Sequence, residues 1–163
     1  TEHGDRLDIF PGGKGLNQSV ALARAGAEVF HAAVFGNDGA FLSDMLKSNG
    51  ADVSLSKTVD EKNGHAIIQV NNDGENAIIV YPGTNHLIDK EYADCVLSHF
   101  GKGDFLILQN EINELEYIIN TAFARGMKII LNPSPIRENL KKRGSGIQSG
   151  CHGTWARGKQ SIF

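Results

Sequence analysis

The residues best suited to chemistry form a glycine-rich stretch, Pro11-Gly12-Gly13-Lys14-Gly15-Leu16-Asn17-Gln18-Ser19. Its glycines allow a tight turn and let a ligand approach the backbone without meeting a Cβ atom. Residues 20–25 are rich in Ala and Leu and predict a helix that ends at Gly26. Free N–H groups at the start of this helix, together with the side chains of Lys14 and Asn17, could bind a polar ligand.

Two common nucleotide-binding motifs do not match this stretch. A P-loop requires Gly, four residues and then Gly-Lys-Ser/Thr, but Asp8 stands five residues before Gly13 and a glycine follows Lys14. A dinucleotide fingerprint requires a third glycine where Gln18 stands. From composition alone, a glycine-rich surface turn before a helix remains the alternative.

Glu111 is the second candidate ligand-binding residue. It follows residues 105–109, a continuous apolar run typical of a strand buried on both faces. Ligands of open parallel sheets bind at the carboxyl ends of the strands, which favours a binding role for this carboxylate. A carboxylate that only contacts solvent is the alternative interpretation.

The order of predicted elements indicates an α/β fold. Helices and strands alternate along most of the chain. Two β-branched runs joined by an Asp-Gly turn interrupt this order and predict an inserted antiparallel hairpin, and residues 53–59 are a possible third strand beside it. An edge hairpin of the main sheet is the alternative. The predicted elements are a strand at 29–35, a helix at 40–49, hairpin strands at 65–70 and 77–81, a helix at 89–100, a strand at 105–109, a helix at 114–125 and a strand at 127–131.

The composition is that of one soluble globular domain. The chain has 163 residues, a net charge of −3 and no apolar run long enough to cross a membrane, so neither a nucleic-acid nor a membrane partner is predicted. Its two cysteines, Cys95 and Cys151, are too few for a disulfide scaffold and favour the cytoplasm. Cys95 is predicted to fill the core.

The spacing of Gly12–Ser19, Gly26 and Gly36 resembles the N-terminal signature of the ribokinase-like (PfkB) carbohydrate kinases. Pro82-Gly83-Thr84-Asn85, Gln109-Asn110-Glu111 and Asn132-Pro133-Ser134-Pro135 are also similar to segments of that family. The resemblance implies a partial ribokinase-like α/β domain over residues 1–142, with antiparallel lid strands at 53–81 that cover the sugar. The lid is also the dimer contact in many members. Asn85 could instead be a helix cap.

The resemblance further implies a kinase that transfers a phosphoryl group from ATP to D-ribose, giving ribose 5-phosphate. Alternatives are a fructokinase, a sugar-phosphate or nucleoside kinase, or a non-catalytic sugar-binding fragment. The full-length parent would use ATP, Mg²⁺ and a monovalent cation such as K⁺, and would pair as a homodimer through the lid. The residues expected to bind the sugar are Gly13, Lys14, Gly15, Leu16, Asn17 and Glu111.

The sequence departs from the family after residue 142. The family's Asn-x-x-Glu and Gly-Ala-Gly-Asp motifs are not found in their expected places, so no catalytic, cofactor-binding or metal-binding residue is predicted in this chain. The chain alone is therefore expected to be inactive. The basic, glycine-rich segment 143–163 is predicted to be non-family sequence and disordered. Cys151 and His152 are too few to form a metal site.

Overall fold

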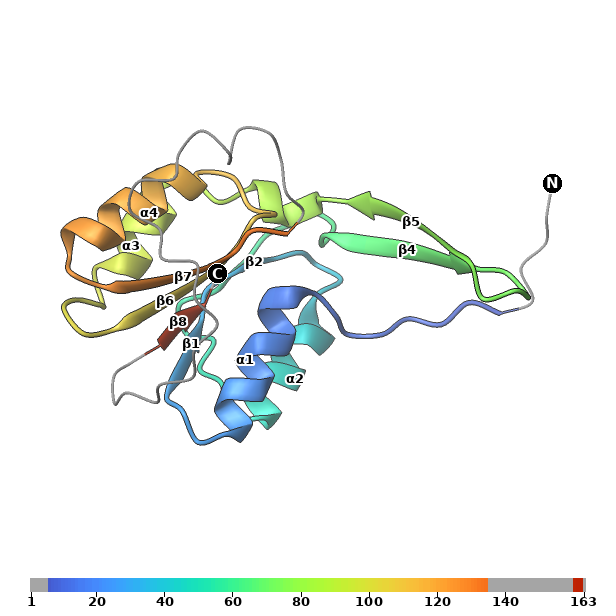
Figure 1. Cartoon of the computed structure of the whole chain (residues 1–163), viewed down its shortest axis with the longest axis horizontal. Coiled ribbons are helices and arrows are strands. Elements are labelled where there is room, and N and C mark those ends of the chain that lie inside the picture. The colour runs from blue at the N-terminus through green and yellow to red at the C-terminus, as the bar shows by residue number, and fades with distance from the viewer. Residues whose placement is uncertain (1–5, 135–159, 163) are drawn as a thin grey trace.

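The computed structural model describes residues 6–134 and 160–162 (Figure 1). The helices are α1 (Lys14–Arg24), α2 (Ala40–Ser48), α3 (Lys90–Leu97), α4 (Leu115–Ala124) and the short 3-10 helix η1 (Gly83–His86). The strands are β1 (Val29–His31), β2 (Val34–Phe35), β3 (Lys57–Thr58), β4 (His65–Val70), β5 (Asn76–Tyr81), β6 (Phe105–Gln109), β7 (Lys128–Asn132) and β8 (Gln160–Ile162). The described part contains no helix long and apolar enough to cross a membrane.

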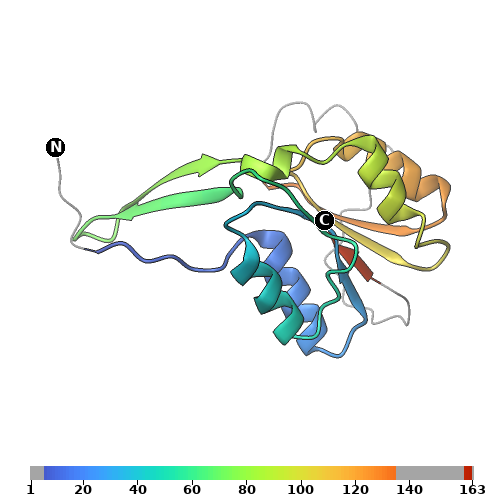
Figure 2. The same cartoon turned by 180° about the vertical axis from the view of Figure 1, so that it is seen from behind.

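A parallel sheet with helices on both faces forms the body of the molecule. Within the described residues its strand order is β1-β8-β6-β7, and each neighbouring pair is parallel. Helices α1 and α2 lie on one side of the sheet, and α3 and α4 lie on the other (Figures 1 and 2). Each side has its own apolar cluster, and Leu106 and Leu108 of β6 are fully buried within the cluster beside α3 and α4. Burial on both faces explains the continuous apolar sequence of β6 and confirms the predicted α/β class.

The strand predicted at residues 29–35 is wrong as a single element, because it divides into β1 and β2. The side chain of Ser56 explains the break: its Oγ donates to the carbonyl of His31 (2.6 Å) and accepts from the N–H of Ala33 (3.2 Å). The hydroxyl of Tyr92 also donates to the carbonyls of Ala33 (3.0 Å) and Leu55 (2.7 Å). Ser56 thus pairs the His31 carbonyl and the Ala33 N–H at the point where the chain passes from β1 to β2.

The third lid strand predicted at residues 53–59 is also wrong. Only Lys57–Thr58 form a strand, β3, which pairs in parallel with β2 and not with the hairpin. The lid therefore consists, within the described residues, of the antiparallel pair β4 and β5.

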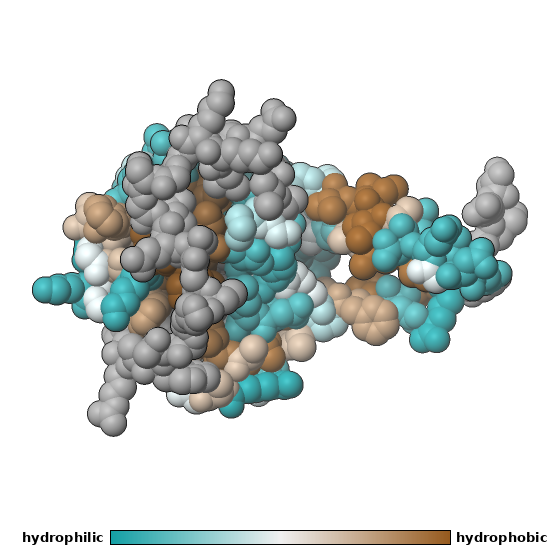
Figure 3. Space-filling view, in the orientation of Figure 1, coloured by the Kyte–Doolittle hydropathy of each residue, from teal (hydrophilic) through white to brown (hydrophobic). Residues whose placement is uncertain are grey.

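The hairpin of β4 and β5 projects away from the body and forms a separate sheet (Figure 1). This confirms the inserted hairpin over the alternative of an edge hairpin of the main sheet. Its turn is held by Asn71, whose Oδ1 accepts from the N–H groups of Asp73 (3.0 Å) and Glu75 (2.9 Å). All twelve strand residues are exposed, and brown apolar atoms cover much of the hairpin surface in Figure 3.

Asn63 holds the base of the hairpin in place. Its Oδ1 accepts from the N–H of Gly36 (3.0 Å), and its Nδ2 donates to Asp38 (2.8 Å). Gly83 packs so closely that a Cβ there would lie 2.4 Å from the carbonyl carbon of Asn63. The hairpin therefore leaves the body from a tightly packed junction.

Helix α3 shows a further departure from the sequence-based expectation. Asp89 caps it by accepting from the N–H of Tyr92 (2.7 Å), and Tyr92 and Val96 face the core as predicted. Cys95 is exposed, so its predicted core position is wrong. At 100° per residue, position 95 lies about 130° around the helix from the middle of the buried face. Asn85 is not a helix cap, because it lies inside η1 and Asp89 occupies the cap of α3.

The structure also differs from the expected disorder of residues 143–163 at its far end. Residues 160–162 form β8, which lies between β1 and β6 and pairs with both. A strand at that position is stabilised by backbone hydrogen bonds on two sides. The sequence of residues 160–162 has no apolar periodicity and does not reveal this pairing. Residues 143–159 and 163, with Cys151 and His152, lie outside the described residues.

Candidate functional site

Helix α1 begins inside the glycine-rich stretch, at Lys14, and thus six residues earlier than predicted. Gly13 precedes the helix with φ 103° and ψ 143°, a conformation that is open essentially to glycine alone. Asn17 makes the first helical hydrogen bond, from its N–H to the carbonyl of Gly13 (3.0 Å). Lys14, Gly15, Leu16 and Asn17 therefore form the first turn of a helix, and the N–H groups of the first three have no intrahelical acceptor.

The structure places Glu111 directly beside this first turn. The Nζ of Lys14 lies 2.5 Å from Oε2 of Glu111, and both side chains keep 34% of their surface exposed. Glu111 reaches this position because it follows the carboxyl end of β6. The positive end of the α1 dipole and the ammonium of Lys14 both favour a carboxylate there. The predicted proximity of the glycine-rich stretch and Glu111 is thus present in the fold.

The other residues expected to bind the sugar have different degrees of access. Asn17 and Gly13 are exposed and Gly15 is half-buried. The side chain of Leu16 is only 6% exposed and packs in the core beside α1, so only its backbone could contact a ligand.

Sequence reasoning missed an amide pair next to the Lys14–Glu111 pair. The Nε2 of Gln109, at the end of β6, donates to Oε1 of Gln18 on α1. Gln109 is only 4% exposed, and its Oε1 has no hydrogen-bond partner among the described residues. A signal was present in the sequence, since Gln109 is a polar residue at the end of an otherwise apolar strand.

A second polar pair lies deeper, between α1 and β1. The Oγ of Ser19 and Nδ1 of His31 are 2.7 Å apart, with exposed fractions of 0% and 5%. The ring of His31 also stacks on Phe35, with ring centroids 6.1 Å apart. Burial lowers the pKa of His31 from 6.5 to about 4, so the ring is neutral at physiological pH.

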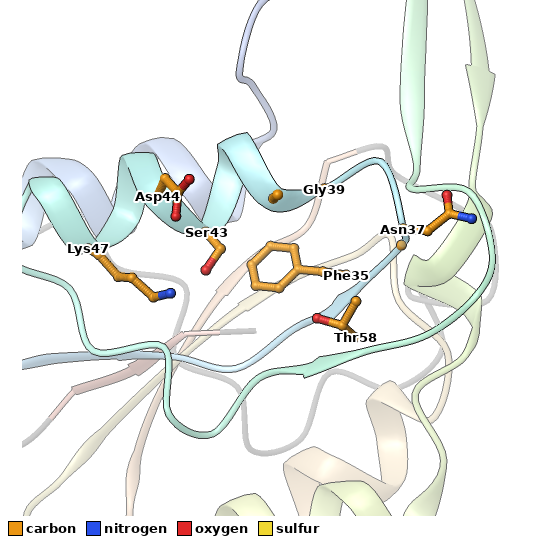
Figure 4. Close-up of a pocket in the computed structure, with 9 residues that line it drawn as sticks. Phe35, Asn37, Gly39, Ser43, Asp44, Lys47 and Thr58 are labelled. Carbon is orange, nitrogen blue, oxygen red and sulfur yellow. The ribbon is translucent and has the colours of Figure 1, made fainter.

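A shallow cavity of about 220 Å³ lies elsewhere, between α2 and the short strands β2 and β3 (Figure 4). Phe35 forms its floor, and Ser43, Asp44 and Lys47 of α2 and Thr58 of β3 line its sides. None of its lining residues belongs to the predicted sugar site. Its lining carries one acidic and one basic side chain, Asp44 and Lys47, and favours no ligand class, so the Lys14–Glu111 region is the better candidate.

Comparisons with known proteins identify the family of the chain. The family model described as pfkB family carbohydrate kinase matches residues 1–144. The chain belongs to this family. Ribokinase from Bacillus subtilis is 35% identical over 138 residues, which are 82% of this chain and 47% of that protein. The chain thus spans about half the length of the curated relatives it matches.

Solved structures of two relatives support the same fold. Ribokinase from Thermotoga maritima has a TM-score of 0.73 and 32% identity, with 85% of this chain and 46% of that one covered. Ribokinase from Cryptococcus neoformans in complex with ADP has a TM-score of 0.67 and 33% identity, with 82% and 41% covered. The described residues therefore form part of a ribokinase-like fold, as the sequence predicted.

Proposed function

We propose that this chain carries the sugar-binding half of a kinase that transfers a phosphoryl group from ATP to D-ribose, giving ribose 5-phosphate. The observation that carries the proposal is the Lys14–Glu111 pair beside the first turn of α1. Membership of the pfkB family supports the reaction class, and the names of the relatives support ribose as the acceptor. The ADP complex of one relative supports a nucleotide as the phosphoryl donor.

The chemistry of the pair suits a sugar. A carboxylate only accepts hydrogen bonds and an ammonium only donates them, whereas a hydroxyl does both. Neighbouring sugar hydroxyls can thus donate to Glu111 and accept from Lys14 without leaving a polar group unpaired. Exposed Asn17 adds a further donor and acceptor one turn along α1. These residues would bind and orient the sugar, which is the positioning component of phosphoryl transfer.

The remaining parts of the reaction are not assigned to this chain. ATP supplies the phosphoryl group when it is bound, and Mg²⁺ and K⁺ would accompany it in the full-length parent. The described residues contain no group of three or more His, Cys, Asp or Glu side chains that could hold a metal ion. With the family's two phosphate-site motifs not found in their places, we expect residues 1–163 alone to bind the sugar without phosphorylating it.

The hairpin would serve as a lid and as a contact between two copies. Paired residues of β4 and β5 share a face, so Ile68, Val70, Ile78 and Val80 lie on one side, and Ile67, Ile79 and Tyr81 lie on the other. All of these side chains are 46% exposed or more. Both apolar faces of the hairpin need a contact that removes them from water. We assign one face to the sugar site and the other face to a second copy of the chain.

Calorimetry with the 163-residue chain tests the sugar site. Ribose is expected to bind, and Glu111→Gln and Asn17→Ala should each weaken binding roughly tenfold, because each removes a hydrogen bond to a hydroxyl. Glu91→Gln, the same change on an exposed position of α3, is the matched control. Equal binding by Glu111→Gln and the unchanged chain would place the sugar elsewhere.

Further measurements test which sugar is the acceptor, whether the chain is inactive, and whether two copies of it pair. Tighter binding of fructose than of ribose would refute the acceptor assignment, and phosphorylation of ribose by residues 1–163 with ATP would refute the expected inactivity.

Light scattering should report a dimer that Ile68→Asp converts to a monomer. A monomeric unchanged chain would refute the pairing through the lid.

A further inference from the structure

Two side-chain contacts join helix α1 to the end of β6, one beside the other. Lys14 and Gln18 are four residues apart on α1 and therefore lie on one face of the helix. Glu111 and Gln109 are two residues apart at the end of β6. Lys14 meets Glu111, and Gln18 meets Gln109. The helix and the strand end are thus joined at two successive points.

The two contacts differ in burial and hence in what each can do. The Lys14–Glu111 pair is one-third exposed and can exchange its partners for a ligand. Gln109 is almost fully buried, and its backbone is fixed in the ladder between β6 and β7, where it pairs with Asn132. The outer contact is therefore suited to binding, and the inner contact is suited to holding α1 in place.

We propose that Gln18 and Gln109 are positioning residues for the sugar site. Their amide–amide hydrogen bond fixes the first turn of α1, with Lys14 and Asn17, relative to Glu111. Neither glutamine needs to contact the sugar for this role. The proposal rests on the proposed function for its ligand, but the contact itself can be tested without one.

The hydrogen bonding of Gln109 separates a positioning role from a purely structural one. Its Oε1 is buried without a partner among the described residues, and an unpaired buried acceptor destabilises a fold. Gln109→Leu removes that atom together with the hydrogen bond to Gln18, and Gln18 is half-exposed, so water can replace its lost partner. The unfolding midpoint should therefore stay the same or rise while ribose binding weakens.

The experiment uses the full 163-residue chain with Gln109→Leu, Gln18→Leu and the double variant. Each single change should weaken ribose binding roughly threefold to tenfold, the range of one net hydrogen bond, and the double variant should bind no more weakly than either single variant. Asn120→Leu, on an exposed position of α4, is the matched control and should bind as the unchanged chain does.

A ligand-free readout keeps the result interpretable. Hydrogen exchange at the backbone amides of Asn17 and Gln18 should become faster in each glutamine variant, while exchange in α4 stays the same. Failure of the unchanged chain to bind ribose would refute the proposed function, and the amide exchange would then decide the positioning role alone. Unaltered exchange, additive losses of affinity, or an unfolding midpoint of Gln109→Leu that falls in step with its affinity would each overturn the proposal.

Discussion

Acidification from neutral pH should destabilise this fold, and His31 is the reason. The folded chain buries the imidazole beside Ser19, which lowers its pKa from 6.5 to about 4. Between these two values the unfolded chain binds a proton that the folded chain does not. Stability therefore rises with pH across this window and is lost as the pH falls.

The size of the effect follows from the two pKa values. Between pH 7.5 and pH 4.5 the difference in proton binding amounts to about 2–3 kcal/mol of unfolding free energy. For a domain of typical stability, 5–15 kcal/mol, roughly a sixth to a half of the unfolding free energy should disappear. Asp38 and Asp89 have pKa values lowered mainly by hydrogen bonds from backbone N–H groups, and they add their losses only below about pH 4.

Urea unfolding at a series of pH values between 7.5 and 4.5 measures this loss. The control is the double variant Ser19→Ala/His31→Phe, which replaces both buried polar partners with apolar ones. It should show little pH dependence over the same range. A loss of less than about 1 kcal/mol in the unchanged chain would mean that the buried ring is not held neutral. An equal loss in the double variant would assign the effect to other groups.

Three substitutions test the backbone and the core. Gly13→Ala should cost about 1–3 kcal/mol of unfolding free energy, since φ there is 103° and the space around a Cβ is open, whereas Gly12→Ala should cost little. Tyr92→Phe should cost about 1–2 kcal/mol, because the carbonyl of Leu55 loses the hydroxyl as a donor and that of Ala33 keeps only the N–H of Lys57. Gly83→Ala, with its clash at the base of the hairpin, should cost more than Gly74→Ala, where φ is also positive but the space is open. Urea unfolding measures all of these, and equal losses within either glycine pair would contradict the reasoning.

The sequence predicted those elements whose patterning is decided locally. Helix α4 and strand β6 show clear periodicity or a continuous apolar run, and the hairpin has an Asp-Gly turn whose positive φ at Gly74 the structure contains. Their bounds differ from the predicted ones by at most one residue. The family resemblance is confirmed over almost the same length, residues 1–144.

The elements that were mispredicted depend on distant partners. The break between β1 and β2 is made by Ser56 and Tyr92, which are more than twenty residues away in sequence. The pairing of β3 with β2 and the position of β8 are likewise set by neighbours in the sheet. No local pattern encodes these contacts, so propensity alone could not give them.

The candidate site shows the same division between local and distant signals. Lys14 and Glu111 could be predicted because a glycine-rich helix start and a strand end each mark ligand sites. The contact of Gln18 with Gln109 spans 91 residues and depends on how α1 lies on the sheet. A polar residue at the end of a buried strand indicates only that some partner exists.

The start of α1 has little stability of its own, which links binding to local folding. Gly15, within the helix, costs it about 1 kcal/mol relative to alanine, and Gly13 provides no side-chain cap for the helix. The first turn depends instead on the burial of Leu16 and on the two contacts with the end of β6. A ligand can contact Lys14 and Glu111 at the same time only when the start of α1 and the end of β6 are both in place. Such a ligand would therefore stabilise the first turn of α1 when it binds.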